Sequence, residues 1–382
     1  MTNAVGEPSA LARCVGNEAE FVQRYWGQRP LVRQAGQTRD NFTDLLDLAE
    51  VDRLVTSSGL RTPAFRLVRD GKPMPESSYT RSIRLGGVPL TGLADPAKVL
   101  AAIDDGATLV LQGLHRYREP LRTLCRELEA ALGCTSQVNA YFTPPGARGL
   151  AVHSDPHDVL VLQAFGAKRW EIHGPDGVLD VLLEPGESLY LPLGTPHAAT
   201  AQDKLSGHIT VGLVPQSWRQ TLSAVVDDLL AEPALDDRLP VGWHDDPDLL
   251  TAELTSRLDE LRTALDKADP HAGALRLTER FWTSRPPALG GALVDRVRLA
   301  ALGEDSVVRR RRGAMCQRRR DRDVLVVWLG DRTLRMPAWV EPAVEQLATA
   351  GSLRVSEVSL DPQSRLVLVR RLVREGLLEV IG

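Results

Sequence analysis

The sequence predicts an α+β protein built on a double-sheet jelly roll of short strands, with helices before and after it along the chain. Between Gln137 and Val214, short β-branched and apolar runs alternate with Gly and Pro at near-regular spacing. This pattern is typical of a barrel or a double-sheet jelly roll rather than of a parallel sheet. On either side of it, Leu, Val and Ala recur at helical spacing. The expected strands are 137–143, 150–154, 158–164, 168–173, 188–191 and 207–214.

The segment before the jelly roll combines helices with one further strand. Phe21–Trp26 predicts a helix that stops at Gly27 and leads into an extended Arg-Pro-Leu-Val. Residues 108–112 are apolar and β-branched and lie between glycines, so they predict a buried strand. Helices are also expected at 42–58, 94–104 and 119–132, whereas residues 1 to about 20 are small and polar and predict partial disorder.

The chain turns helical after Ser217. Helices are expected at 218–231, from Asp246-Pro247 onward, and at about 272–283. An Asp followed by Pro is a favourable helix start. In the second helix, leucines recur at spacings of four, three and four and form one stripe: Leu254, Leu258, Leu261 and Leu265. An intradomain helix bundle and a dimer seam both explain such a stripe.

The last stretch predicts a small winged-helix-like module. It opens with two arginine-rich blocks, continues with a strand and three helices, and ends with a closing strand: 309–312, 318–322, 324–329, 338–350, 354–359, 362–375 and 377–381. Clustered arginines can bind nucleic-acid phosphates. Such runs are more often solvated or paired with acids, so nucleic-acid contact is the less favoured interpretation. We therefore expect a jelly-roll domain with N-terminal helical elements at 1–217, a helical region at 218–300 and the winged-helix-like domain at 301–382.

Composition narrows the class of protein. With 382 residues, the chain is long enough for two or three domains and a large core. A formal net charge of -4 and 25% charged residues give no global sign of a nucleic-acid or membrane protein. Four scattered cysteines fit free thiols in a reducing cytosol better than disulfides or a zinc site. Because neither a signal-peptide pattern nor an apolar run of about 18 residues occurs, we expect a soluble cytoplasmic protein.

One constellation of side chains predicts a metal site. His153 and Asp155 stand at i and i+2, and residues at that spacing on a strand point to the same face, so both can bind one ion. His197 follows a Pro-Gly-Glu turn and a short apolar run, as a third ligand on a distant strand should. Two imidazoles and one carboxylate make the facial triad that holds non-haem Fe(II) and leaves coordination positions open. The absence of cysteine ligands disfavours a closed structural zinc site.

Further polar side chains are expected around the same cavity. Lys168 lies between apolar Phe165 and Trp170, and if the metal works with 2-oxoglutarate, this lysine can hold the distal carboxylate as a point charge. Asn139 and Tyr141 share one face of an earlier strand, as do His208 and Thr210 of the strand after His197. We interpret His208 as a barrel histidine with satisfied hydrogen bonds, and His157 as a neighbour of the site or a surface residue.

These residues together resemble the JmjC-type ribosomal oxygenases of the cupin-4 group, which are Fe(II)- and 2-oxoglutarate-dependent hydroxylases of protein side chains. The resemblance covers nearly the whole chain and includes His-x-Asp with Lys168 fifteen residues after His153, and His208-x-Thr210. It also includes Arg-Tyr-Trp-x-x-Arg-Pro-Leu near the start, Leu-Val-Leu-x-Gly-x-His at 109–115, Asn-x-Tyr-x-Thr-Pro-Pro at 139–145 and the Pro-Gly-Glu…Pro-x-Gly-x-x-His segment.

The resemblance implies roles for these residues. His153, Asp155 and His197 would bind iron, and Lys168 would hold 2-oxoglutarate with Tyr141, Asn139 and Thr210 nearby. Dioxygen would be the second cosubstrate, and the product a ribosomal protein or other peptide hydroxylated on a side chain, at Cβ of Arg or His. The domain order implies a double-stranded β-helix core, a helical dimerisation region and a C-terminal winged helix, and hence a homodimer. Gly212 departs from relatives that carry Ser two residues beyond His-x-Thr, which can change the side chain that is accepted.

Two other functions stay open from the residues alone. A cupin metalloenzyme that does not use 2-oxoglutarate would have the same metal ligands and no need of Lys168. A ligand-sensing regulator would bind nucleic acid through the arginine-rich blocks and the winged-helix-like module.

Overall fold

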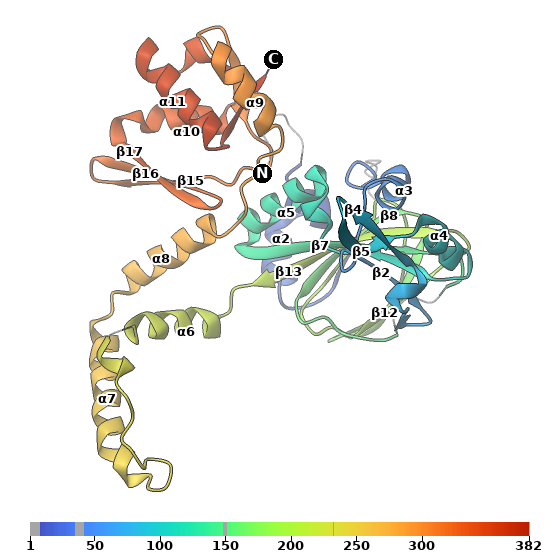
Figure 1. Cartoon of the computed structure of the whole chain (residues 1–382), viewed down its shortest axis with the longest axis horizontal. Helices are drawn as coiled ribbons and strands as arrows, with labels where there is room; N and C mark the ends of the chain where they lie inside the picture. The colour runs from blue at the N-terminus through green and yellow to red at the C-terminus, as the bar shows by residue number, and fades with distance from the viewer. Residues whose placement is uncertain (1–7, 35–41, 148–150, 232, 382) are drawn as a thin grey trace. The chain divides into compact units, whose positions relative to one another are not determined.

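The computed structural model describes residues 8–34, 42–147, 151–231 and 233–381. Between residues 31 and 215 the chain forms a jelly roll of two antiparallel sheets (Figure 1). The larger sheet has the order β1 (Leu31–Arg33), β11 (Ser188–Leu191), β8 (Asp158–Phe165), β13 (Ser206–Pro215), β7 (Cys134–Thr143), β6 (Thr108–Leu111), β2 (Phe65–Arg69) and β3 (Lys72–Pro73). The smaller sheet has the order β10 (Gly177–Leu183), β9 (Lys168–Gly174) and β12 (His197–Ala201). The predicted jelly roll with mixed helices and sheets is confirmed.

Alternate residues of the larger sheet belong to two different layers. In β8, Leu160 and Leu162 pack into the main core together with the N-terminal helices, whereas Val159 and Val161 pack against the smaller sheet. Both faces of β8 are therefore buried, which explains why its sequence is apolar without alternation. The inner layer between the sheets is where the polar site residues converge.

Helices cover the outer face of the larger sheet. They are α1 (Ala10–Val15), α2 (Glu18–Arg24), α3 (Leu48–Thr56), α4 (Pro96–Asp104) and α5 (Glu119–Leu132). In α5, buried Leu121, Leu124 and Leu128 recur at helical spacing and face the core, and the helix ends at Gly133, whose φ of 64° is left-handed. The predicted disorder of residues 1–20 is wrong for the described part, because α1 and α2 form there and bury Leu11 and Phe21.

One predicted strand is also wrong. The described residues of the interval 150–154 form a loop, with a single β-bridge from His153 to His197. Pro156, which cannot donate a hydrogen bond to a ladder, follows this segment at once. The structure adds strands that were not expected, among them β10, β12 and the hairpin of β4 (Thr80–Leu85) and β5 (Val88–Ala94).

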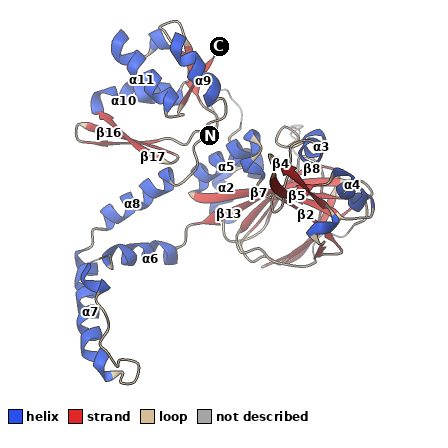
Figure 2. Cartoon of the chain, in the orientation of Figure 1, coloured by secondary structure: helices blue, strands red, loops and turns tan. Residues whose placement is uncertain are grey.

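Residues 216–287 and 315–341 form a compact unit of their own. It contains α6 (Trp218–Leu229), α7 (Asp248–Lys267), α8 (Pro270–Thr283) and a sheet of β15 (Gln317–Asp321), β16 (Val324–Leu329) and β17 (Arg332–Pro337) (Figure 2). The sheet packs against α8, whereas α6 and α7 bury none of their residues. The predicted leucine stripe of α7 is thus exposed to solvent within this unit.

The remaining C-terminal residues, 288–314 and 342–382, cluster with residues 1–215. Their described part contains α9 (Ala292–Arg298), α10 (Glu341–Thr349), α11 (Pro362–Arg374) and a sheet of β18 (Leu353–Arg354), β14 (Val307–Arg310) and β19 (Leu378–Ile381). Short single turns of 3-10 helix occur among these elements, at 299–301 and 355–357. α10, α11 and β19 match the elements predicted at 338–350, 362–375 and 377–381, whereas the helix predicted at 354–359 is only the turn at 355–357 and α9 was not expected. The winged-helix-like domain boundary stays a prediction.

The first arginine-rich block has structural roles. Arg311 is buried and donates hydrogen bonds to the carboxylate of Asp295 and to backbone carbonyls of residues 290, 376 and 378. Arg309 pairs with Glu379 at 2.6 Å, and Arg310 donates to the carbonyls of Ala314 and Ala348. Guanidinium groups so engaged tie β14 to its neighbours, which favours acid pairing over nucleic-acid binding for this block. Within the described ranges, no helix has the length and apolar character needed to cross a bilayer.

Candidate metal centre and pocket

The three predicted metal ligands lie together because backbone hydrogen bonds connect a loop to the start of β12. The amides of His153 and His197 donate to each other's carbonyls, at 3.0 and 2.8 Å. The amide of Gly194 donates to the carbonyl of Asp155 at 3.0 Å. The loop between β7 and β8 is thereby fixed against the turn that leads into His197.

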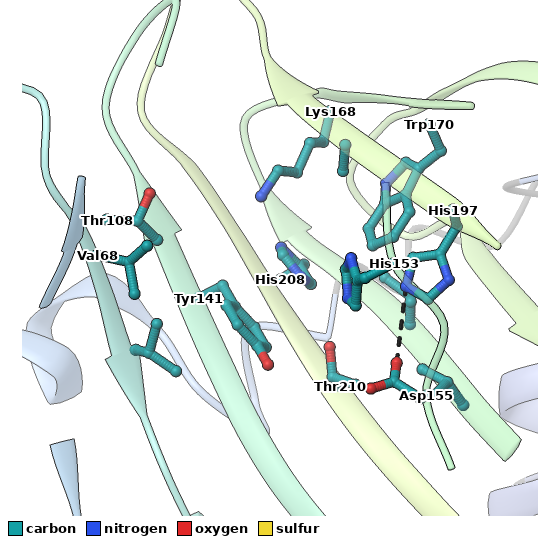
Figure 3. A pocket seen from close by; sticks show the side chains of 14 residues that line it. Val68, Thr108, Tyr141, His153, Asp155, Lys168, Trp170, His197, His208 and Thr210 are labelled. Carbon is teal, nitrogen blue, oxygen red and sulfur yellow. Dashed lines mark ion pairs between the residues drawn. The ribbon is translucent and has the colours of Figure 1, made fainter. Parts of the chain in front are cut away.

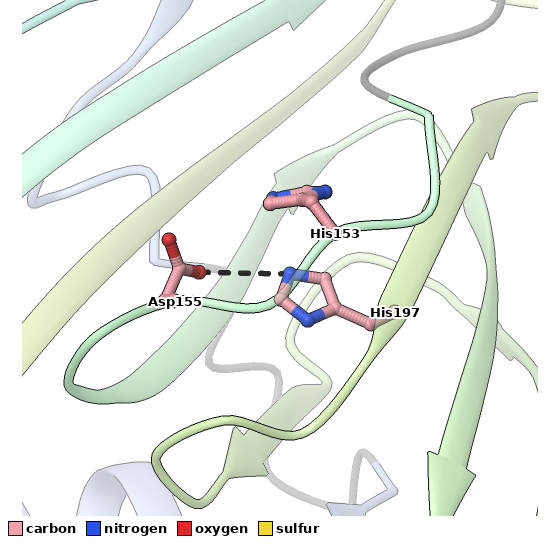
Figure 4. A group of neighbouring side chains, drawn as sticks. All are labelled: His153, Asp155 and His197. Carbon is pink, nitrogen blue, oxygen red and sulfur yellow. Dashed lines mark ion pairs between the residues drawn. The ribbon is translucent and has the colours of Figure 1, made fainter.

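The side chains of His153, Asp155 and His197 converge on one point (Figure 4). One potential ligand atom from each lies within 4.8 Å of the others. Nε2 of His197 is 3.6 Å from a carboxylate oxygen of Asp155, and the two imidazole rings are 4.4 Å apart and inclined at 54°. Two nitrogens and one oxygen on one side of a common point suit a divalent ion that keeps other positions open.

The surroundings of both histidines select the tautomer that a metal needs. Nδ1 of His153 is 2.8 Å from the carbonyl of Ala151, and Nδ1 of His197 is 2.9 Å from the carbonyl of Thr195. Because a carbonyl only accepts, each Nδ1 carries the hydrogen and each Nε2 presents its lone pair to the site. Burial lowers the pKa of His197, while the Thr195 carbonyl opposes this shift by raising it. A neutral imidazole is the form that binds a metal ion.

A pocket extends from the triad between the two sheets (Figure 3). Its walls come from β9 and β12 on one side and from β2, β6, β7, β8 and β13 on the other. Besides the triad, its lining consists of Val68, Thr108, Val110, Tyr141, Val159, Val161, Lys168, Trp170, Ala199, His208 and Thr210. The walls are therefore mostly apolar, with a few polar groups directed inward.

Lys168 is a buried cation at one end of this pocket. It is 2% exposed, and its ammonium donates to the hydroxyl of Thr143 at 3.1 Å. No carboxylate of the described residues lies within ion-pair distance of it. Burial lowers the pKa of Lys168 to about 7. An ammonium group with free donors and no counter-ion is a site for an anion.

His208 differs from expectation. Its ring stacks on that of Tyr141 at 5.0 Å and meets the edge of Trp170 at 5.4 Å. The ring is buried, and its Nδ1 has no hydrogen-bond partner among the described residues, so this histidine is not the satisfied core residue that the sequence suggested. Burial lowers the pKa of His208 well below its usual value, and the nearby charges of Lys168 and His197 lower it further. It lines the pocket as a neutral imidazole.

The other predicted cosubstrate residues are placed differently from one another. Tyr141 and Thr210 line the pocket, and Thr210 lies beside Asp155 (Figure 3). Asn139 is not among the lining residues: its amide oxygen accepts from the backbone of Gly113 at 3.1 Å. Binding of 2-oxoglutarate by these residues stays a prediction.

Asp158 supports the site and was not foreseen. This buried carboxylate accepts a hydrogen bond from the Tyr190 hydroxyl at 2.6 Å and from the backbone of Leu193 at 2.7 Å. Leu193 belongs to the turn that carries His197. The only sequence signal is an acidic residue at the head of an apolar strand, which is ambiguous without the contacts.

Known sequences are similar to this chain around the site. Residues 114–178 and 173–221 match the family described as JmjC domain. The chain is 27% identical over 240 residues to the bifunctional lysine-specific demethylase and histidyl-hydroxylase NO66 of Drosophila persimilis, covering 58% of this chain and 34% of that protein. It is 28% identical over 230 residues to ribosomal oxygenase 1 of Gallus gallus, covering 54% and 37%. The chain thus spans about a third of the length of these relatives.

Solved structures share the fold over nearly the whole chain. The crystal structure of the Escherichia coli ribosomal oxygenase YcfD matches with a TM-score of 0.58 and 22% sequence identity, over 96% of this chain and 98% of that one. The same protein in complex with cobalt and 2-oxoglutarate matches with a TM-score of 0.57 and 21% identity, over the same shares. This degree of similarity establishes the common fold.

Removing a triad side chain should abolish metal binding without unfolding the protein. We expect His153→Ala and Asp155→Ala each to weaken Co²⁺ binding by more than about 100-fold. Loss of a group that only orients a metal ligand already lowers metal affinity by about 10- to 100-fold, and loss of the ligand itself should lower it further. Equilibrium dialysis of the metal-free protein measures this. His173→Ala is the matched control, since His173 pairs with Glu171 and lines no part of the pocket. Wild-type affinity in either triad variant would contradict the site.

Proposed function

We propose that this chain, whose residues 114–221 match the JmjC domain, is an Fe(II)- and 2-oxoglutarate-dependent oxygenase that hydroxylates a protein side chain. One observation carries the proposal. A two-histidine, one-carboxylate triad opens onto a mostly apolar pocket, and at one end of that pocket is a buried lysine that has no counter-ion among the described residues. The triad meets the requirement for a site that binds Fe(II), and the buried lysine meets the requirement for a cation that binds the carboxylate of 2-oxoglutarate.

The residues fit the metal and the cosubstrate. His153, Asp155 and His197 would hold Fe(II), and Lys168 would hold the distal carboxylate of 2-oxoglutarate. The unpartnered Nδ1 of His208 and the hydroxyl of Tyr141 line the space between these two anchors and are available to hydrogen-bond the cosubstrate. When bound, iron, 2-oxoglutarate and dioxygen supply the oxidising power needed to hydroxylate an unactivated carbon.

The chain's own contribution is orientation and exclusion of water. Backbone carbonyls fix both imidazoles with Nε2 toward the metal position. Val159, Val161 and Trp170 pack in the apolar layer between the sheets and give the pocket apolar walls that disfavour water. In such a place an ion pair between Lys168 and a carboxylate is much stronger than in water.

The relatives' names suggest the class of substrate. NO66 is named a histidyl-hydroxylase, and ribosomal oxygenases are matched both in sequence and in fold. We therefore propose a ribosomal protein as substrate, hydroxylated at Cβ of an Arg or His side chain, and a cytoplasmic location, where ribosomes are found. A cupin enzyme that does not use 2-oxoglutarate would have no carboxylate ligand for the buried ammonium group of Lys168.

We also propose that the chain is a homodimer, with domains at 1–217, 218–300 and 301–382. The support is the exposed apolar face of the helical region. Leu254 and Leu258 of α7 are 55% and 56% exposed, and Trp218 of α6 is 80% exposed. Every residue of both helices is described, and none is buried. Apolar stripes of this kind are normally covered, and the same stripe on a second copy is a self-complementary partner.

The dimer predicts a change of mass in solution. We expect the wild-type protein to have twice the chain mass in size-exclusion chromatography with light scattering, and Leu254→Glu/Leu258→Glu to be monomeric, because carboxylates in an apolar seam cost several kcal/mol. Ser256→Glu/Thr263→Glu, on the opposite face of the same helix, is the control. A monomeric wild-type protein at micromolar concentration would contradict the dimer.

Catalysis should depend on 2-oxoglutarate and on a protein acceptor. We expect the anaerobically Fe(II)-loaded protein to form succinate when oxygen is admitted, and to do so faster with a pool of ribosomal proteins, one of which gains an oxygen atom. His153→Ala and Asp155→Ala should abolish both signals. Metal binding without 2-oxoglutarate binding would instead favour the cupin enzyme that does not use it.

Binding of 2-oxoglutarate should be coupled to a proton. With its pKa lowered to about 7, Lys168 is largely neutral at pH 8, and a bound carboxylate favours its charged form. We expect proton uptake on binding at pH 8, and an affinity that falls by up to about tenfold per pH unit above 7. Calorimetry of the Co²⁺-loaded protein in buffers of different ionisation enthalpy measures the uptake.

The control for this coupling is Lys168→Arg, because a guanidinium stays charged throughout this range. It should bind without the additional proton. Equal uptake by the wild-type protein and by this variant would show that another group titrates.

A further inference from the structure

The pocket has a closed end and an open end, and these lie in order along β13. Ser206 and Thr143, paired in register, are fully buried beside Lys168. His208 and Thr210 follow on the same face, with Thr210 next to Asp155 (Figure 3). The side chain of Asp155 is 32% exposed. Under the proposed function, 2-oxoglutarate occupies the closed end, so a side chain of a protein substrate has to enter beyond Thr210.

Gly212 is the next residue of β13 on this face. It pairs with Gln137 of β7 on one side and with Val159 of β8 on the other, in regular antiparallel register. Its φ is not in the left-handed region, so the backbone does not require a glycine. A glycine inside a paired strand often marks a place where another group approaches closely.

That group is the imidazole of His157. A Cβ at position 212 would lie 2.8 Å from Cε1 of this ring and 3.1 and 3.2 Å from its two nitrogens. Real Cβ atoms do not come so near, so any side chain at 212 would displace the ring. The ring of His157 therefore occupies the space that a side chain at position 212 would need.

Hydrogen bonds at both nitrogens hold the ring in place. Nδ1 is 3.0 Å from the carbonyl of Asp158 and therefore carries the hydrogen, which leaves Nε2 to accept from the side-chain amide of Gln137 at 3.4 Å. The backbone on either side is anchored as well, by the bond from Gly194 to Asp155 and by the buried Asp158. The ring is thus fixed beside Gly212, one alternate position of β13 beyond the pocket residue Thr210.

We propose that His157, seated on Gly212, is a specificity-determining residue that contacts the substrate side chain as it enters the open end of the pocket. The proposal rests on the proposed function. In this proposal His157 would narrow the entrance beyond Thr210 with a fixed imidazole, whose position is set by Gly212 and by two hydrogen bonds. A side chain at position 212 would displace the ring, so His157 and Gly212 together would set which side chains reach the metal position.

The test is a double-mutant cycle on protein hydroxylation. The variants are His157→Ala, Gly212→Ala and the double variant, with His173→Ala as the matched histidine control. Succinate formation stimulated by ribosomal proteins is measured below saturation, and the oxidised residues are mapped by mass spectrometry. We expect His157→Ala to lower the stimulated rate on the order of tenfold, the range that one lost pocket contact produces, and to change the set of oxidised residues.

Gly212→Ala should cause a similar loss because it displaces the ring, and the double variant should be no worse than His157→Ala alone. Calorimetry should show that His157→Ala binds 2-oxoglutarate and Co²⁺ with wild-type affinity. This result would separate a change in substrate selection from damage to the metal-binding loop. An unchanged stimulated rate and product set for His157→Ala, multiplicative losses in the double variant, or a parallel loss of 2-oxoglutarate binding would each overturn the inference. Failure of the wild-type protein to form succinate would overturn the proposed function itself.

Discussion

Two backbone hydrogen bonds, from His153 to His197 and back, join a loop without regular structure to the first residue of β12. The loop follows β7 of the larger sheet, and β12 belongs to the smaller sheet, so this one bridge connects the two halves of the jelly roll at the metal position. The triad exists only while the sheets are in register there. The apolar layer around Val161 and Trp170 holds them together from within.

Stability and chemistry compete within this layer. Within the pocket that this layer surrounds, the protein buries an ammonium group and a neutral imidazole whose Nδ1 has no partner among the described residues. Each costs free energy in a folded chain without ligands, because a buried polar group loses its water. The outer core between the larger sheet and helices such as α5 offsets this cost by mostly apolar packing. The separation into two layers lets the inner one be polar where ligands bind.

The sequence predicts the jelly roll and the convergence of the triad, although the strand that should carry two of its ligands does not form. Spacing at i and i+2 predicts that His153 and Asp155 share a strand face, yet they lie in a loop and converge because backbone hydrogen bonds at both ends fix it. Spacing on a strand is a local property, whereas a loop's course is set by distant partners. The contact between His157 and Gly212 joins residues far apart in the chain, and no periodic pattern encodes it. Likewise, Asn139 shares a face with Tyr141 but turns its amide to Gly113, a choice that depends on a neighbouring element.

The burial of Lys168 has a consequence for regulation. An ammonium at the closed end of a pocket recognises a carboxylate by its charge and by its distance from the metal. The contact between Lys168 and Thr143 does not distinguish one bound acid from another. Under the proposed function, the acid that remains after decarboxylation keeps the carboxylate that Lys168 held. Product and cosubstrate would therefore compete for one cation, and turnover would follow the ratio of the two acids rather than the amount of either. An enzyme built in this way reports the metabolic state of its cell through the modification that it makes.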